Sequence, residues 1–177
     1  MEGSVGGFRI GVISDTHIRR LPINLPERLY QIFEDVDMIL HAGDIQHQEV
    51  LYELSAFAPV YAVAGNCDGW DIAHALGRKR IIDVKGFKIG IVHGSARGDN
   101  AWISAYSEFD PLLDLKRPKL DCLIYGHTHA PYLNEVNGMK IMNPGSPTEK
   151  RSQPHYTVGM IEIMDGRLET SIIQLDD

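Results

Sequence analysis

Residues 8–17 read FRIGVISDTH, an apolar run that ends in polar and charged residues. The run from Phe8 to Ser14 predicts a buried strand, because short apolar segments rich in β-branched residues suit the interior of a sheet. Asp15 and His17 follow at its end, and in an extended segment residues two apart point to the same side. The stretch therefore predicts a strand that delivers a carboxylate and an imidazole to one small volume.

Four more polar signatures follow apolar runs further along the chain. They are Gly43-Asp44, Gly65-Asn66-Cys67-Asp68, His93-Gly94 and Gly126-His127-Thr128-His129. The glycines permit tight turns that aim the next side chain inward. Because ligands bind outside the carboxyl ends of strands in open α/β sheets, we expect these Asp, Asn and His side chains to gather along one edge.

Strands and helices alternate in the first part of the chain. After the first strand we expect a helix capped by Asn24, a strand over residues 38–41, a helix face over residues 50–57 and a strand over residues 60–64. This order implies parallel strands joined by right-handed crossovers.

The later part of the chain favours hairpins. Residues 99–116 also carry a helical pattern, which Pro111 is expected to break into two pieces. The chain ends in two antiparallel strands, at residues 156–164 and 168–175. Three Xaa-Gly pairs predict tight turns between neighbouring strands: Lys85-Gly86, Asn137-Gly138 and Asp165-Gly166. Two sheets packed face to face, with helices outside, would cover all of these apolar faces.

Length and composition predict one domain, over residues 8–177, after a flexible glycine-rich tail at residues 1–7. The net charge of -7 disfavours broad binding of nucleic acid or of an anionic membrane, which needs many basic residues. Two cysteines give no disulfide framework, and the first residues lack the layout of a signal peptide. We therefore expect a cytoplasmic protein.

The candidate ligands also indicate a type of metal. Imidazole, carboxylate and an amide oxygen together suit Mn²⁺, Fe²⁺, Zn²⁺ or Ni²⁺, and the lack of a thiolate cluster argues against a structural zinc site. Two such ions would outweigh the charges of Asp15 and Asp44, attract a phosphate and lower the pKa of bound water. Each signature alone has a structural explanation, such as a turn for Gly-Asp or a core histidine for His93. Five signatures in order favour the metal site.

Together these residues resemble the calcineurin-like metallophosphoesterase superfamily, and in particular its small single-domain phosphodiesterase branch, which includes the retromer subunit. The resemblance extends from about Phe8 to Leu175 and includes Asn143-Pro144-Gly145-Ser146. It implies an α/β fold, a four-layer α/β/β/α sandwich of two mixed sheets. It also implies two divalent metal ions, with Mn²⁺ preferred and Ni²⁺, Fe²⁺ or Zn²⁺ as alternatives.

The resemblance also assigns the ligands. One metal would be held by Asp15, His17 and His129, the other by Asn66, His93 and His127, with Asp44 bridging both. Larger members of the superfamily have a histidine after the ligand asparagine, whereas this chain has Cys67, as the small branch often does.

The expected activity is a metal-dependent phosphodiesterase in which a metal-bridging hydroxide attacks phosphorus, with Asp44, Asn66 and Cys67 as catalytic residues. A Cys67 thiolate is a rival nucleophile. Because the usual histidine donor is missing, substrates with good leaving groups are expected, unless His47 or His155 supplies the proton.

Arg97 and Trp102 are the candidate substrate contacts: Arg97 for a nonbridging oxygen, Trp102 for stacking on a base or aryl group. The alternative is an ordinary surface loop, and the same applies to Arg19 and Arg20. His41 is expected to be buried and structural, whereas Asp68 could orient its neighbours or form a turn.

Two other functions share this sequence pattern: a phosphomonoesterase or nucleotidase, and a non-catalytic protein-interaction scaffold on the same fold. The retained ligands favour an enzyme. The expected partner is a small phosphate ester, without a membrane partner, and a homo-oligomer is left open.

Overall fold

The stretch at residues 8–17 forms β1 (Phe8–Ile13), the middle strand of a five-stranded sheet. We describe residues 6–176 of a computed structural model, so residues 1–5 of the predicted tail lie outside the described part. Across the sheet the strands are β10 (Arg167–Gln174), β9 (Thr157–Met164), β1, β2 (Met38–His41) and β3 (Val60–Ala62). β2 and β3 run parallel to β1, whereas β9 is antiparallel to both β1 and β10.

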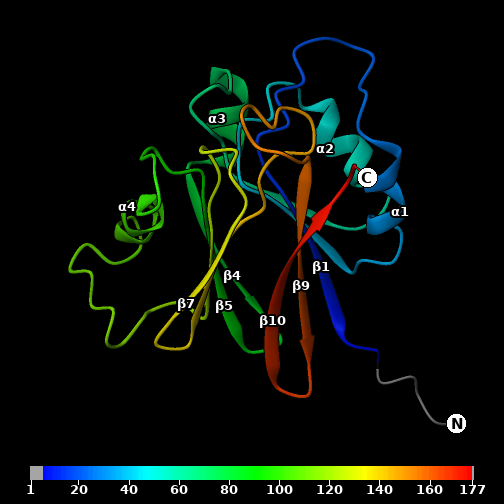
Figure 1. Cartoon of the computed structure of the whole chain (residues 1–177). Helices are drawn as coiled ribbons and strands as arrows, with labels where there is room; N and C mark the ends of the chain where they lie inside the picture. Colours follow the sequence, from blue (N-terminus) through cyan, green and yellow to red (C-terminus); the bar gives the residue numbers. More distant parts are fainter. Residues whose placement is uncertain (1–5, 177) are drawn as a thin grey trace, which may run out of the picture.

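A second five-stranded sheet packs against the first (Figure 1). Its strands, in order across the sheet, are β4 (Lys79–Val84), β5 (Phe87–Val92), β6 (Cys122–Ile124), β8 (Met139–Asn143) and β7 (Tyr132–Val136). The three central strands are parallel to one another, and both edge strands are antiparallel to their neighbours. Both sheets are therefore mixed, as the resemblance implies.

Helices cover the outer faces of the two sheets. They are α1 (Glu27–Phe33), α2 (Glu49–Leu54), α3 (Trp70–Leu76) and α4 (Ala101–Ser107). On β1, Ile10 and Val12 belong to the cluster between the sheets, whereas Ile13 packs with Leu29 of α1. This alternation follows from the two-residue period of a strand, and it produces the predicted α/β/β/α sandwich.

Gly11 lets a helix pack closely on the first sheet. A Cβ at Gly11 would lie 2.7 Å from the ring of Phe33, so only glycine lets α1 approach β1 this closely.

At the lower end of the molecule, the three predicted hairpin turns form with positive φ at both residues of each Xaa-Gly pair (Figure 1).

Several local predictions need correction. The cap of α1 is Pro26 and not Asn24, and no side chain caps this helix. The helix expected over residues 99–116 forms only as α4, because turns follow Asp110, whose carboxylate accepts the backbone N–H groups of Leu112 and Asp114. α3 was not predicted. Within residues 6–176, no helix combines the length and apolar character needed to span a membrane.

Candidate metal centre

The five polar signatures meet at the upper end of the sandwich (Figure 1). Three of them follow β1, β2 and β3 of the first sheet, and two follow β5 and β6 of the second. The predicted edge therefore belongs to two sheets rather than to one. Backbone hydrogen bonds join the loops within each sheet, from Asp15 N to Gly43 O (2.9 Å) and from Gly126 N to His93 O (3.0 Å).

Five of the seven predicted ligands have a left-handed backbone. They are Asp15 (φ 56°), His17 (46°), Asp44 (56°), His127 (70°) and His129 (59°). This conformation is uncommon for residues other than glycine, and it is concentrated at functional sites, where surrounding contacts hold it.

Each of the two aspartates has one oxygen held by the protein and one directed at the other ligands. Asp15 Oδ2 accepts from Ser14 Oγ (2.8 Å) and from His127 N (3.1 Å), whereas Oδ1 is buried without a hydrogen-bond partner. Asp44 Oδ1 accepts from Cys67 N (2.7 Å). Its Oδ2 lies 3.4 Å from His17 Nε2 and 3.1 Å from His93 Nε2.

Three of the histidines are oriented in the same way. Their Nδ1 atoms donate to protein oxygens: His17 to Gln46 Oε1 (3.2 Å), His93 to Ala42 O (2.7 Å) and His129 to Glu149 O. In the neutral ring the Nε2 atom then carries the lone pair and faces the centre, as in ligating imidazoles. His17 Nε2 and His129 Nε2 lie 3.2 Å apart.

The remaining ligand candidates complete a second group around Asn66. Its Oδ1 lies 3.1 Å from His93 Nε2 and 3.0 Å from His127 Nδ1. Potential donor atoms lie within 4.8 Å of one another in Asp15, His17 and His129, and likewise in Asp15, Asp44 and His93. The orphaned Asp15 oxygen and the facing imidazole nitrogens fit a divalent cation, because a cation would satisfy all of them.

Asp68 holds two of the loops in place. Its carboxylate accepts four backbone N–H groups, from Asp44 (3.0 Å), Ile45 (2.8 Å), Gln46 (2.6 Å) and Gly65 (2.7 Å). It therefore fixes the loop after β2 against the loop after β3. Of the two roles expected for Asp68, the structure supports orientation of the ligands.

The segment after β8 connects the two sheets behind the ligands. Ser146 Oγ donates to Asp15 O (2.8 Å), and Thr148 Oγ1 donates to Thr16 O (2.5 Å). Asn143 Nδ2 donates to Gly126 O (2.9 Å). The residues at 143–146 thus support the left-handed loops, and Glu149 extends the same segment to His17 and His129.

Glycine allows the loops to approach each other closely. A Cβ at Gly65 would lie 2.1 Å from Asp44 Oδ1, and a Cβ at Gly126 would lie 2.1 Å from Ser14 Oγ. A larger residue at position 65 would displace the Asp44 carboxylate. One at position 126 would displace Ser14 Oγ, which donates to Asp15.

The carboxylates favour positive charge at the centre. Burial alone would lower the pKa of His93, but the hydrogen bond to Asp44 and the charge of Asp15 raise it above its ordinary value. The pKa of Asp44 is lowered despite burial, through its hydrogen bond with His93. His41 differs: burial lowers its pKa to about 3, so it is neutral, and it contacts Thr16 Oγ1 (3.2 Å), in line with the predicted structural role.

Cys67 lies at the exposed mouth of the site, beside Asn66. Partial burial and the negative charge of Asp44 raise the pKa of its thiol. The thiol form is therefore favoured, which weakens the hypothesis of a thiolate nucleophile. In the described chain, His47 pairs with Glu49 and His155 with Asp176, and neither hydrogen-bonds a predicted ligand.

The two predicted substrate contacts have different surroundings. Arg97 is exposed and lines a cavity of about 240 Å³ beside His127. Trp102 is only 7% exposed and packs in the cluster between α4 and the second sheet. The predicted stacking role of Trp102 is therefore wrong, because its side of the helix faces the core.

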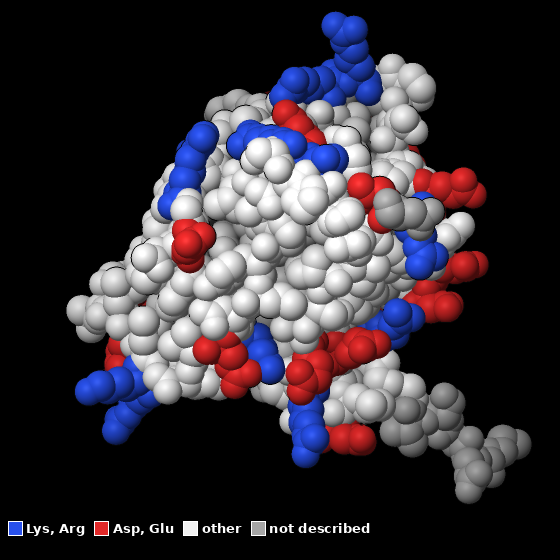
Figure 2. Space-filling model, viewed as in Figure 1, with Lys and Arg blue, Asp and Glu red and all other residues white. Residues whose placement is uncertain are grey.

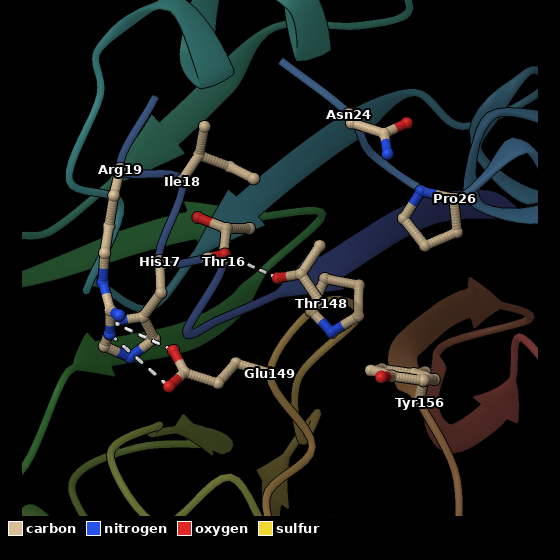
Figure 3. Close-up of a pocket in the computed structure, with 10 residues that line it drawn as sticks. Thr16, His17, Ile18, Arg19, Asn24, Pro26, Thr148, Glu149 and Tyr156 are labelled. Carbon is tan, nitrogen blue, oxygen red and sulfur yellow. Dashed lines mark hydrogen bonds and ion pairs between the residues drawn. The ribbon is translucent and has the colours of Figure 1, made fainter. Parts of the chain in front are cut away.

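A larger cavity of about 470 Å³ lies on the other side of His17 (Figure 3). Asn24, Pro26 and Tyr156 face it opposite Glu149. Arg19 also lines it, and its charge is matched by Glu149 (3.5 Å). Of the predicted ligands, only the buried His17 lines this cavity, whereas Asn66 and His127, the least buried ones, do not.

Sequence reasoning missed three residues near the centre: Gln46, Glu149 and Arg151. Gln46 lies in the loop after β2 with a left-handed backbone (φ 67°), so no strand periodicity marks it. Glu149 and Arg151 follow the Asn143-Pro144-Gly145-Ser146 sequence, which was noted without a role for the residues beyond it.

The fold and the site together define a two-sheet α/β sandwich with candidate ligands for divalent metal at the loops where its two sheets meet. A family model described as "Calcineurin-like phosphoesterase superfamily domain" matches residues 8–166. The chain therefore belongs to the calcineurin-like phosphoesterase superfamily, which confirms the resemblance.

Comparisons with individual proteins agree with this assignment. A probable metallophosphoesterase of Methanothermobacter thermautotrophicus is 38% identical over 168 residues, 93% of this chain and 91% of the relative. A phosphodiesterase of Methanocaldococcus jannaschii is 29% identical over 154 residues, 78% of this chain and 83% of the relative. The structure of Vacuolar Protein Sorting 29 from Cryptosporidium parvum superposes with a TM-score of 0.71 at 20% identity, covering 97% of this chain and 100% of that one. At that identity the similarity concerns the fold alone.

Proposed function

We propose that the protein is a phosphodiesterase that depends on two divalent metal ions, with Mn²⁺ preferred. The observation that carries this proposal is the position of Asp44 Oδ2 between His17 Nε2 and His93 Nε2. One carboxylate oxygen thereby adjoins both groups of ligands, as a bridging ligand must. Membership in the superfamily supports phosphoester chemistry, and the relative named as a phosphodiesterase supports a diester substrate.

The protein's own residues would hold and orient the reacting groups. Asp15 and Asp44 supply the negative charge, and the oriented histidines fix the ligand positions. The bound metals would supply an activated water as the nucleophile and neutralise charge on the phosphate. Asn66, Cys67 and His127 are the least buried members of the site, so the ester would approach over them. A small phosphate ester suits this opening, and the net charge of -7 disfavours polymeric nucleic acid.

Cys67 makes the proposal specific about the leaving group. A thiol with a raised pKa is a poor substitute for a histidine as proton donor. Because general acid catalysis is typically worth about 10²–10⁴-fold, esters whose leaving group needs no proton should react fastest.

The test is hydrolysis of a panel of phosphate esters after chelation and separate readdition of Mn²⁺, Ni²⁺, Zn²⁺ and Mg²⁺. We expect metal-dependent turnover in which aryl phosphodiesters exceed alkyl phosphomonoesters by at least about 10²-fold. Comparable rates on the two classes would refute the leaving-group argument. Lack of turnover with every metal would refute the proposal that the protein is a phosphodiesterase.

A protein-interaction scaffold is the second candidate, favoured by the shared fold with Vacuolar Protein Sorting 29. The same panel separates the two functions, because a scaffold requires no metal-dependent turnover. The retained ligand geometry favours the enzyme.

A further inference from the structure

We infer that the cavity beside His127 is a subsite for a second anionic group of the substrate, held by Arg97 and Arg151. The inference rests on the proposed function, since it concerns the part of the phosphodiester that is not cleaved off. It would make the preferred substrate a diester that carries an additional phosphate or carboxylate close to the reacting phosphorus.

The position of the cavity connects it to the centre. Its lining includes His127, a predicted metal ligand, and the two arginines come from separate segments, after β5 and after β8. Arg97 and Arg151 line the same cavity as His127, so both guanidinium groups adjoin the space beside this ligand.

Both arginines are available for a ligand. Each is exposed, and among residues 6–176 neither makes an ion pair or a side-chain hydrogen bond with another residue. Arg19, near the larger cavity, instead pairs with Glu149 and donates to Gln46 Oε1 (3.2 Å). An arginine without a protein partner keeps its planar donors free for a phosphate or carboxylate, which it can bind with two parallel hydrogen bonds.

The charge around the cavity favours an anion. Asp99 is the one carboxylate in its lining, against two arginines. Figure 2 shows Lys and Arg side chains gathered at the upper end of the molecule, whereas red and blue side chains alternate along its lower margin. Although the whole chain is acidic, the exposed charges at the upper end of the face shown in Figure 2 are mostly basic, which would draw an anionic substrate toward it.

The size of the cavity limits what it can hold. Its volume of about 240 Å³ is below the roughly 300–1,000 Å³ of sites that enclose a whole small-molecule ligand. Tyr125 and Tyr132 form one wall, with ring centroids 6.5 Å apart. The space therefore suits one short anionic arm of a substrate and not a second whole ligand.

The test measures binding without turnover. Metal-loaded protein, in excess Mn²⁺, is titrated by calorimetry with three non-hydrolysable probes. Methylphosphonate carries one anionic group, 3-phosphonopropionate adds a carboxylate, and ethane-1,2-bisphosphonate adds a second phosphonate. We expect both two-anion probes to bind at least about tenfold more tightly than methylphosphonate, because charge-assisted hydrogen bonds are the stronger ones. The larger of the two preferences identifies the anion.

Variants assign the preference to the cavity. In the double variant R97Q/R151Q the preference should fall below about threefold. Arg20 is exposed, lies in the loop after β1 and does not line the cavity, so R20Q is a matched control that should retain the preference. Thermal unfolding of each variant checks that it is folded.

Three results would overturn the inference: equal affinities of the wild-type protein for all probes, an unchanged preference in R97Q/R151Q, or an equal loss in R20Q. Failure of the proposed function is distinguishable, because it would leave the binding preference intact while no phosphodiester is hydrolysed. If only the subsite inference is wrong, phosphodiesters are hydrolysed but the two-anion probes bind no more tightly than methylphosphonate.

Discussion

The two ends of the sandwich both use left-handed backbone, but for different purposes. At the lower end, Lys85-Gly86, Asn137-Gly138 and Asp165-Gly166 reverse the chain, and a Cβ built on any of these glycines meets nothing within 4 Å. At the upper end, positive φ values include those of five predicted ligands, aspartates and histidines, four of which are buried among other loops.

The difference shows what each conformation depends on. A two-residue hairpin turn is favoured by its own sequence, because Asn, Asp and Gly tolerate positive φ and the twist matches the strands. The ligands at the upper end lie outside such turns, and positive φ is uncommon for residues other than glycine, so contacts from elsewhere must hold them. Asp68 and the segment at 143–149 provide those contacts. The lower end is thus locally determined, and the upper end is determined by tertiary structure.

The largest expected effect comes from replacing an aspartate with asparagine at each end. Asp44→Asn removes the shared negative charge while keeping the shape, so metal-dependent turnover should fall by at least about 10²–10³-fold. Asp165→Asn lies in a hairpin turn that asparagine also favours, and it should leave turnover unchanged. Steady-state kinetics on an aryl phosphodiester measures both. Full turnover in Asp44→Asn would exclude the bridging role.

A smaller effect is expected from the aspartates that hold backbone N–H groups. Asp68→Ala should weaken metal affinity by about 10–100-fold, the usual cost of removing a group that orients ligands. Asp121 accepts one backbone hydrogen bond, from Lys88 N (2.7 Å), and contacts none of the predicted ligands. Asp121→Ala should therefore leave metal affinity unchanged. Calorimetric titration with Mn²⁺ provides the comparison. Equal affinities in the two variants would show that Asp68 acts only on stability.

A third comparison concerns glycine. Gly65→Ala forces a methyl group against Asp44, and overpacking of this kind lowers the free energy of unfolding by about 1–3 kcal/mol. Gly86→Ala has open space around it and only the strain of a positive φ, so its loss should be about 1 kcal/mol. Urea denaturation measures both losses. A greater loss in Gly86→Ala would contradict the assignment of tight packing to the upper end.

The smallest expected effect is on thermal stability, and it concerns Asp110, a residue outside the metal centre and the hairpin turns. It differs from the others in its dependence on pH. The hydrogen bond from Lys119 lowers the pKa of Asp110, which also accepts from Leu112 and Asp114. A lowered pKa stabilises the folded state above the ordinary carboxyl pKa, and this contribution disappears as pH falls through the folded value. Asp110→Asn should therefore unfold at a lower temperature than the wild-type protein at pH 7, and the difference should vanish in strong acid. A difference independent of pH would show that charge at Asp110 is irrelevant.

Sequence alone predicted what local patterns determine. The hairpins follow from their Xaa-Gly pairs, and the seven ligand positions follow from polar residues after apolar strands. It could not show that two sheets share the edge, because the partner of a strand depends on the whole topology. It misassigned Trp102, although the four-residue spacing from Tyr106 places both on the apolar face of α4, where they are buried. Arg151 carried no local signal, and the fold alone brings it to the cavity beside His127.

The central claim is that the loops of both sheets bring their side chains together around two metal ions. Crystals grown with Mn²⁺ and measured at wavelengths on both sides of the manganese absorption edge test it most directly. We predict two anomalous peaks, one among Asp15, His17 and His129 and one among Asn66, His93 and His127, with Asp44 between them. Absence of peaks at these residues, or a single peak elsewhere on the surface, would contradict it.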